Sequence, residues 1–73
     1  MSTHPKPKVK SARLLAELTQ AQLAAKAGVS RQTIISIERG DYAPSVYLAL
    51  KIARELSSKV EQLFHLTDDA PQQ

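Results

Sequence analysis

The segment 19–40, TQAQLAAKAGVSRQTIISIERG, limits the possible folds more than any other part of this 73-residue chain. It predicts two short helices, at about residues 20–27 and 31–39, joined by a turn at Gly28. The chain has only two glycines, Gly28 and Gly40, and each follows a predicted helix, where a left-handed backbone costs glycine little. Because no strand-like alternation occurs anywhere, the chain is expected to be all-α.

Polar residues mark the start of both helices. Thr19 is placed to cap the first, with Gln22 three residues later to complete a capping box, and Ser30 is placed to cap the second. Ile34 and Ile37 share one face of the second helix. Its other face is polar and basic, with Arg31, Gln32, Thr33 and Ser36. This arrangement is typical of a helix-turn-helix, whose second helix enters the major groove of DNA.

Three further short helices are expected around this pair, at about residues 8–16, 45–56 and 59–64. Ser45 is placed to cap the second of these, in which Leu48, Ile52 and Leu56 recur at intervals of four. Pro44 disfavours a helical residue before it, so residues 41–44 are expected to form a loop. The expected organisation is a disordered arm at 1–7, one domain at 8–66 and a flexible tail at 67–73.

The charge distribution suits a polyanion. Residues 1–64 carry ten basic and five acidic groups, a net charge of +5, and the acidic pair Asp68 and Asp69 lies in the tail. The alternative is that this positive charge serves only to keep the protein soluble. The arm could contact DNA through Lys6 and Lys8, or could be a mobile terminus only.

Several classes of protein are disfavoured. With no cysteine, two histidines near the ends and no carboxylate pair beside a nucleophile, an enzyme is the weakest option. His65 with Asp68 and Asp69 fits no recognised zinc spacing, so no metal or other cofactor is expected. No apolar run approaches the ~20 residues of a membrane span, and no secretory signal is seen, so the cytoplasm is the expected location.

Taken together, these residues resemble the Cro/C1-type helix-turn-helix family, over roughly residues 9–64. The matching positions are Gln20, Ala24, Gly28, Ile34, Ile37, Glu38-Arg39-Gly40 and Pro44-Ser45. The resemblance implies a compact five-helix, lambda-repressor-like domain. It also implies a small dimeric transcriptional regulator, a repressor, that reads a palindromic operator in double-stranded DNA through residues 31–39.

The resemblance also implies roles for single residues. Arg31, Gln32 and Ser36 match base-reading positions, for which arginine suits guanine and glutamine suits adenine; contact with solvent or phosphate is the alternative. The positions that match backbone or supporting contacts are Gln20, Ser30, Thr33, Arg39 and Tyr42. Arg13 and Glu38 match an ion pair that links the first and third helices, the alternative being two separately solvated charges.

The sequence departs from the family pattern at three places. Glu17 stands where glycine or asparagine usually ends the first helix, and a left-handed backbone would cost glutamate about 1 kcal/mol. Ser57-Ser58-Lys59 replaces the usual Gly-Val-Ser, which removes a glycine stop and an apolar anchor before the last helix. Ile35 stands at a usually polar position, where it either meets a thymine methyl group or packs beside the core.

Partners other than DNA are also expected. Part of an apolar C-terminal patch must cover the core, and the remainder is interpreted as a twofold dimer interface, unless all its residues serve the monomer core: Val60, Leu63, Phe64 and Leu66. A different hypothesis makes the chain an antitoxin that binds a toxin through its N-terminus or acidic tail. A controller protein of a restriction–modification system is a third possibility.

Overall fold

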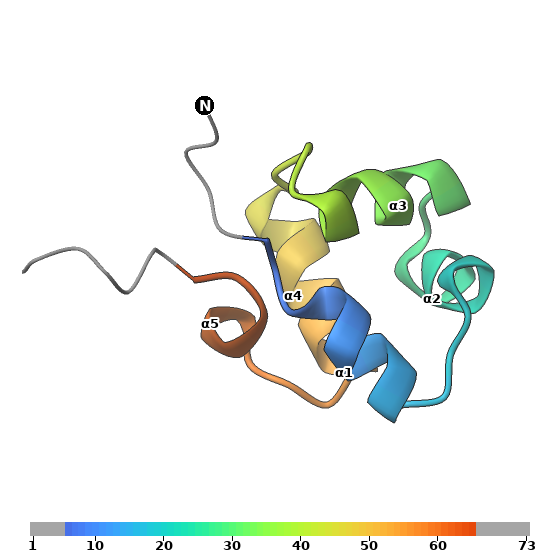
Figure 1. Cartoon of the computed structure of the whole chain (residues 1–73), viewed down its shortest axis with the longest axis horizontal. Coiled ribbons are helices and arrows are strands. Elements are labelled where there is room, and N and C mark those ends of the chain that lie inside the picture. The colour runs from blue at the N-terminus through green and yellow to red at the C-terminus, as the bar shows by residue number, and fades with distance from the viewer. Residues whose placement is uncertain (1–5, 66–73) are drawn as a thin grey trace, which may run out of the picture.

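The computed structural model describes residues 6–65, and within them five helices and no strand are found (Figure 1). The helices are α1 (Val9–Leu15), α2 (Gln20–Ala27), α3 (Arg31–Arg39), α4 (Val46–Glu55) and α5 (Val60–Leu63). The predicted all-α fold and the predicted limits of α2 and α3 are confirmed, and the other helices differ from prediction by a single residue at each end. Most of the expected arm, the tail and Leu66 lie outside the described residues.

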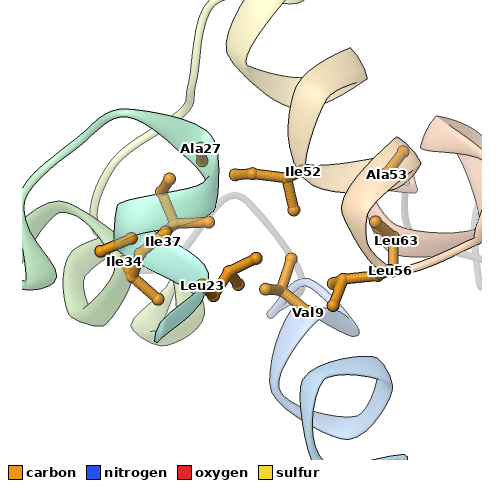
Figure 2. Close-up of a cluster of buried hydrophobic side chains, with 10 residues drawn as sticks. Val9, Leu23, Ala27, Ile34, Ile37, Ile52, Ala53, Leu56 and Leu63 are labelled. Carbon is orange, nitrogen blue, oxygen red and sulfur yellow. The ribbon is translucent and has the colours of Figure 1, made fainter. Parts of the chain in front are cut away.

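One aliphatic core joins the five helices. The fully buried side chains are Val9 of α1, Leu23 of α2, Ile34 and Ile37 of α3, Ile52 of α4 and Leu63 of α5. Figure 2 shows these side chains pointing toward a common centre, together with Ala27, Ala53 and Leu56. Burial of each large aliphatic side chain contributes roughly 1.5–3 kcal/mol. The small buried Ala24 and Ala27 let α2 lie close against its neighbours.

The turn between α2 and α3 has the geometry that its residues predict. Thr19 Oγ1 accepts a hydrogen bond from Gln22 N at 3.0 Å, and Gln22 Oε1 accepts one from Thr19 N at 2.8 Å. Gly28 ends α2 with φ +75°, and Ser30 Oγ accepts from Thr33 N at 3.1 Å to begin α3. The predicted capping box, glycine end and serine cap are therefore confirmed.

Two other helices end in the same left-handed turn without a glycine. Glu17 follows α1 with φ +61°, and Leu18 N donates to Arg13 O at 3.1 Å. Ser57 follows α4 with φ +53°, and Ser58 N donates to Ala53 O at 2.8 Å. These hydrogen bonds are those of a Schellman motif. The backbone therefore follows the same course as it would with glycine, and the absence of glycine adds only conformational strain at each turn. The departure at 57–59 accordingly leaves α5 packed on the core.

The beginning of the described chain lies between α5 and the end of α3 (Figure 1). Lys8 N donates to Leu63 O at 2.8 Å, which joins the segment before α1 to the last helix. A Cβ atom built on Gly40 would lie 3.8 Å from Lys6 Cα. Residues 6–8 are therefore held at the C-terminal end of α3.

Candidate nucleic-acid interface

The outward face of α3 is polar. Ile34, Ile37 and Glu38 are buried, which leaves the opposite side of the helix facing solvent. Gln32, Ser36 and Arg39 follow one another at intervals of four and three, so they form one stripe on that side. Beside this stripe lie Arg31, which is exposed, and Ile35, which is half-buried. Two of the three predicted base-reading residues thus share the centre of this face, and Arg31 lies at its edge.

A polar cleft of about 370 Å³ follows one flank of α3. It is lined by Ser30, Gln32, Thr33, Ser36, Asp41 and Tyr42, and is called the α3–loop cleft below. Two of its lining residues, Ser30 and Thr33, share a hydrogen bond of 3.0 Å between Oγ and Oγ1. The structure therefore brings together most of the residues for which DNA contacts are predicted. Sequence reasoning assigned no role to Asp41, whose carboxylate lies 3.3 Å from Arg39 Nε in an exposed pair.

A second cleft, of about 430 Å³, lies on the other flank of α3. It is called the α1–α3 cleft and is lined by Lys6, Pro7, Lys10, Ser11, Gln20, Ile35, Glu38 and Arg39. Three of these side chains are cationic. The basic N-terminal sequence pointed only to an arm, so Lys10 and Ser11 of α1 were missed as possible contacts.

A buried ion pair fixes α1 to α3. Arg13 Nε donates to Glu38 Oε2 at 2.6 Å and Arg13 Nη2 donates to Oε1 at 3.3 Å, while Nη1 donates to Leu18 O at 2.9 Å. Both residues are less than a tenth exposed, so the two charges are paired and not separately solvated. Removing one member of such a pair leaves an uncompensated buried charge, which is strongly destabilising.

The same network holds Gln20 at the start of α2. Gln20 Nε2 donates to Glu38 Oε1 at 3.1 Å. The amide nitrogen has a second hydrogen, which it can donate to an anion lying at the N-terminus of α2. The backbone N–H groups and the positive dipole end of that helix favour an anion at the same place. The geometry is therefore suited to the phosphate contact that is expected of Gln20.

A different surface, here called the α4–α5 surface, is apolar. Val46, Tyr47 and Leu50 of α4 are 73%, 84% and 51% exposed. A groove of about 300 Å³ runs beside them, lined by Ala43, Pro44, Val46, Ala49, Leu50, Val60 and Phe64. Sequence reasoning missed the α4 residues, although Val46 and Leu50 have the spacing of one helix face.

The predicted dimer patch needs a correction at Leu63. Leu63 is only 2% exposed because it packs among the core residues of α1 and α4, so it is not available to a second copy. Val60 and Phe64 are half-buried and border the apolar groove. Leu66 lies outside the described residues.

Residues 6–65 contain neither a cluster suited to a metal ion nor a membrane-spanning helix. In that range no three side chains of histidine, cysteine, aspartate or glutamate gather as a possible metal site. Asp68 and Asp69, named above with His65, lie outside it. No helix in the same range is long and apolar enough to cross a membrane.

The amino-acid sequence matches one family of known proteins. The profile of the family described as "Helix-turn-helix" matches residues 9–63, which include all five helices. An HTH-type transcriptional regulator of Methanocaldococcus jannaschii is 55% identical over 64 residues, which cover 88% of this chain and 97% of that protein.

Solved structures with the same fold include regulators. The restriction–modification controller protein C.AhdI from Aeromonas hydrophila aligns with a TM-score of 0.72 and 30% identity, over 78% of this chain and 86% of that one. SinR, a master regulator of biofilm formation in Bacillus subtilis that was solved in complex with DNA, aligns with a TM-score of 0.69 and 31% identity, over 74% and 87% of the two chains. The chain therefore belongs to the Cro/C1-type helix-turn-helix family, a class of DNA-binding transcriptional regulators and not of enzymes.

Proposed function

We propose that this protein binds double-stranded DNA sequence-specifically and regulates transcription by placing α3 in the major groove. The observation that carries the proposal is the polar stripe of Gln32, Ser36 and Arg39, which faces solvent between two polar clefts. A major groove about 12 Å wide admits one α-helix, and the base edges then meet the outward stripe of that helix.

The proposed contacts divide into two groups. Gln32 can pair with adenine N6 and N7, Arg31 with guanine O6 and N7, and Ser36 with either kind of base edge. Phosphate or supporting contacts are assigned to Gln20, Ser30, Thr33, Arg39 and Tyr42. The base contacts select the sequence, while the phosphate contacts set the register of α3 on the duplex.

We further propose that the protein acts as a homodimer through the α4–α5 surface. Val46, Leu50, Val60 and Phe64 form an apolar area around a groove, and a second copy would exclude water from it. Two recognition helices related by a twofold axis would read half-sites about 34 Å apart, hence a palindromic operator. A dimer on a promoter excludes polymerase, so the proposed action is repression, in the cytoplasm of a prokaryotic cell.

The test is selection of DNA from a random duplex library, followed by sequencing of the retained duplexes. The expected result is a motif with twofold symmetry whose halves lie one helical turn apart. Gln32→Ala, run in parallel, should alter the motif at one position in each half. Salt-sensitive retention without any enriched motif would contradict sequence-specific binding and leave only a general affinity for DNA.

One second candidate has a specific observation in its favour. The likeness to C.AhdI covers most of that controller protein, at 30% identity. Control of a restriction–modification operon is therefore a narrower form of the same proposal. It predicts a nuclease gene beside the gene for this chain, whereas a toxin partner predicts a gene for a small toxic enzyme there. Most of the N-terminal segment and all of the acidic tail, which are expected to bind a toxin, lie outside the described residues.

A further inference from the structure

We propose that the α1–α3 cleft binds a phosphate of the DNA backbone, with Lys6 and Lys10 as its principal cations. This inference rests on the proposed function, because its ligand is the duplex that α3 reads. It extends the contact surface beyond the helix-turn-helix, to the segment before α1 and to the first turn of α1.

The cleft is assembled from four separate segments. Lys6 precedes α1, Lys10 lies in its first turn, Gln20 begins α2 and Arg39 ends α3. The segment that carries Lys6 is held by the hydrogen bond from Lys8 N to Leu63 O and by its approach to Gly40. Lys6 is therefore positioned by the fold, so it loses less conformational freedom on binding than a residue of a mobile arm would.

The charges of the cleft favour an anion. Lys6, Lys10 and Arg39 face it, and the carboxylate of Glu38 is already neutralised by Arg13. Asp41 lies close to Arg39, but both side chains are more than half exposed. An exposed pair of this kind is weak because water screens it, so Arg39 can exchange Asp41 for a phosphate at little cost.

The position of the cleft fits a duplex bound at α3. Ile35 and Arg39 line the α1–α3 cleft, whereas Thr33 and Ser36 line the α3–loop cleft on the opposite flank. When a helix lies in the major groove, the two sugar-phosphate backbones run along its two sides. One backbone would then follow Ser30, Thr33 and Tyr42, and the other would follow Lys6, Lys10 and Gln20. Contacts on both flanks would fix the tilt of α3 as well as its register.

The experiment compares the double variant K6Q/K10Q with R54Q and with the wild type. Arg54 is an exposed cation in the last turn of α4, and Figure 1 shows that end of α4 on the side of the domain away from α3. Each duplex affinity is measured by fluorescence anisotropy at several salt concentrations. Circular dichroism melting checks that all three proteins fold alike, which is expected because the three substituted side chains are exposed.

The expected result is a smaller salt dependence for the double variant alone. The slope of log K against log salt should fall by about 0.9 for each phosphate contact removed, with an unchanged selected motif. Ethylation interference should lose signals at the same one or two phosphates in each half-site. If K6Q/K10Q has the slope and the interference pattern of R54Q while the wild type binds its motif, this inference is overturned and the proposed function stands. If the wild type binds no duplex, both fail.

Discussion

Helices α3 and α4 are built alike on the inside and differ on the outside. Each buries isoleucine or alanine on one face, Ile34 and Ile37 in α3 and Ile52 and Ala53 in α4. The exposed side of α3 carries amide, hydroxyl and guanidinium groups, whereas that of α4 carries Val46, Tyr47 and Leu50 beside the cations Lys51 and Arg54. The core therefore explains the buried halves of both helices, and only the exposed halves distinguish their functions.

The difference indicates two kinds of partner. The polar groups of α3 are hydrated in the free protein and can exchange water for base edges and phosphates. The apolar side chains of Val46 and Leu50 make no hydrogen bonds with water, and an exposed apolar patch is the kind of surface on which the proposed protein–protein contact would form. The proposed DNA binding on α3 and the proposed self-association on α4 are therefore separable, and substitutions can test them one at a time.

The largest effect is expected at the buried ion pair that fixes α3 to α1. Glu38→Ala should destabilise the fold by about 3–5 kcal/mol, because Arg13 would be left buried without its partner. Urea unfolding followed by circular dichroism measures this loss. Arg39→Ala, which removes only an exposed pair, should cost about 0–1 kcal/mol. A loss below about 1 kcal/mol for Glu38→Ala would mean that the ion pair does not hold α3 in place.

The next effect concerns α4. Leu50→Asp should weaken a homodimer by at least about 2 kcal/mol, roughly thirtyfold in Kd, since it would bury an unpaired carboxylate in each copy. Sedimentation equilibrium measures the change. Leu15→Asp provides the control, because Leu15 is an exposed leucine of α1 outside the α4–α5 surface. Equal association by both variants, or a monomeric wild type at high micromolar concentration, would refute the proposed interface.

On α3, Gln32→Ala should cost about 1–3 kcal/mol at the preferred site and relax the preference at one base pair, with self-association unchanged. Competition between the selected duplex and single-base variants measures both effects. Uniform weakening on all sequences would instead identify Gln32 as a phosphate contact, which would leave Arg31 and Ser36 as the base-reading residues.

The smallest effect is at the helix ends, where α3 stops at a glycine and α4 at Ser57. Ser57→Gly and Glu17→Gly should each stabilise the fold by about 0.5–1 kcal/mol, because both residues have positive φ. Thermal melting should show a rise of about 2–8 °C for each. Ala25→Gly, in the exposed interior of α2, should have the opposite sign. Lower melting temperatures for both end variants would show that these side chains stabilise their turns.

Local signals predicted most of the fold. Thr19, Gln22, Gly28 and Ser30 act within three residues of the helix ends that they form, so sequence alone located α2 and α3. In α4 the period predicted the buried Ile52 and Leu56, but Leu48 is only half-buried. Leu63 was misassigned because the burial of a residue in a one-turn helix depends on which neighbours cover it.

The candidate site was less accessible to such reasoning. The pair of Arg13 and Glu38 spans 25 residues, and only the family resemblance suggested it. Nothing in the local sequence shows that Lys6 lies beside Gly40, because that approach depends on how α5 holds the first residues. The proposed role of Lys10 depends instead on the packing of α1 against α3, which the pair of Arg13 and Glu38 fixes.

The hydrogen bond between Lys8 and Leu63 makes the domain nearly a closed ring, since its first and last helices meet through the backbone. A short linker could therefore join residue 65 to residue 6, with new ends opened in the loop at 41–44. Such a circular permutant would begin with α4 and α5 and end with α2 and α3. It would keep the same core and both exposed surfaces, but α4 would now precede α3 in the chain.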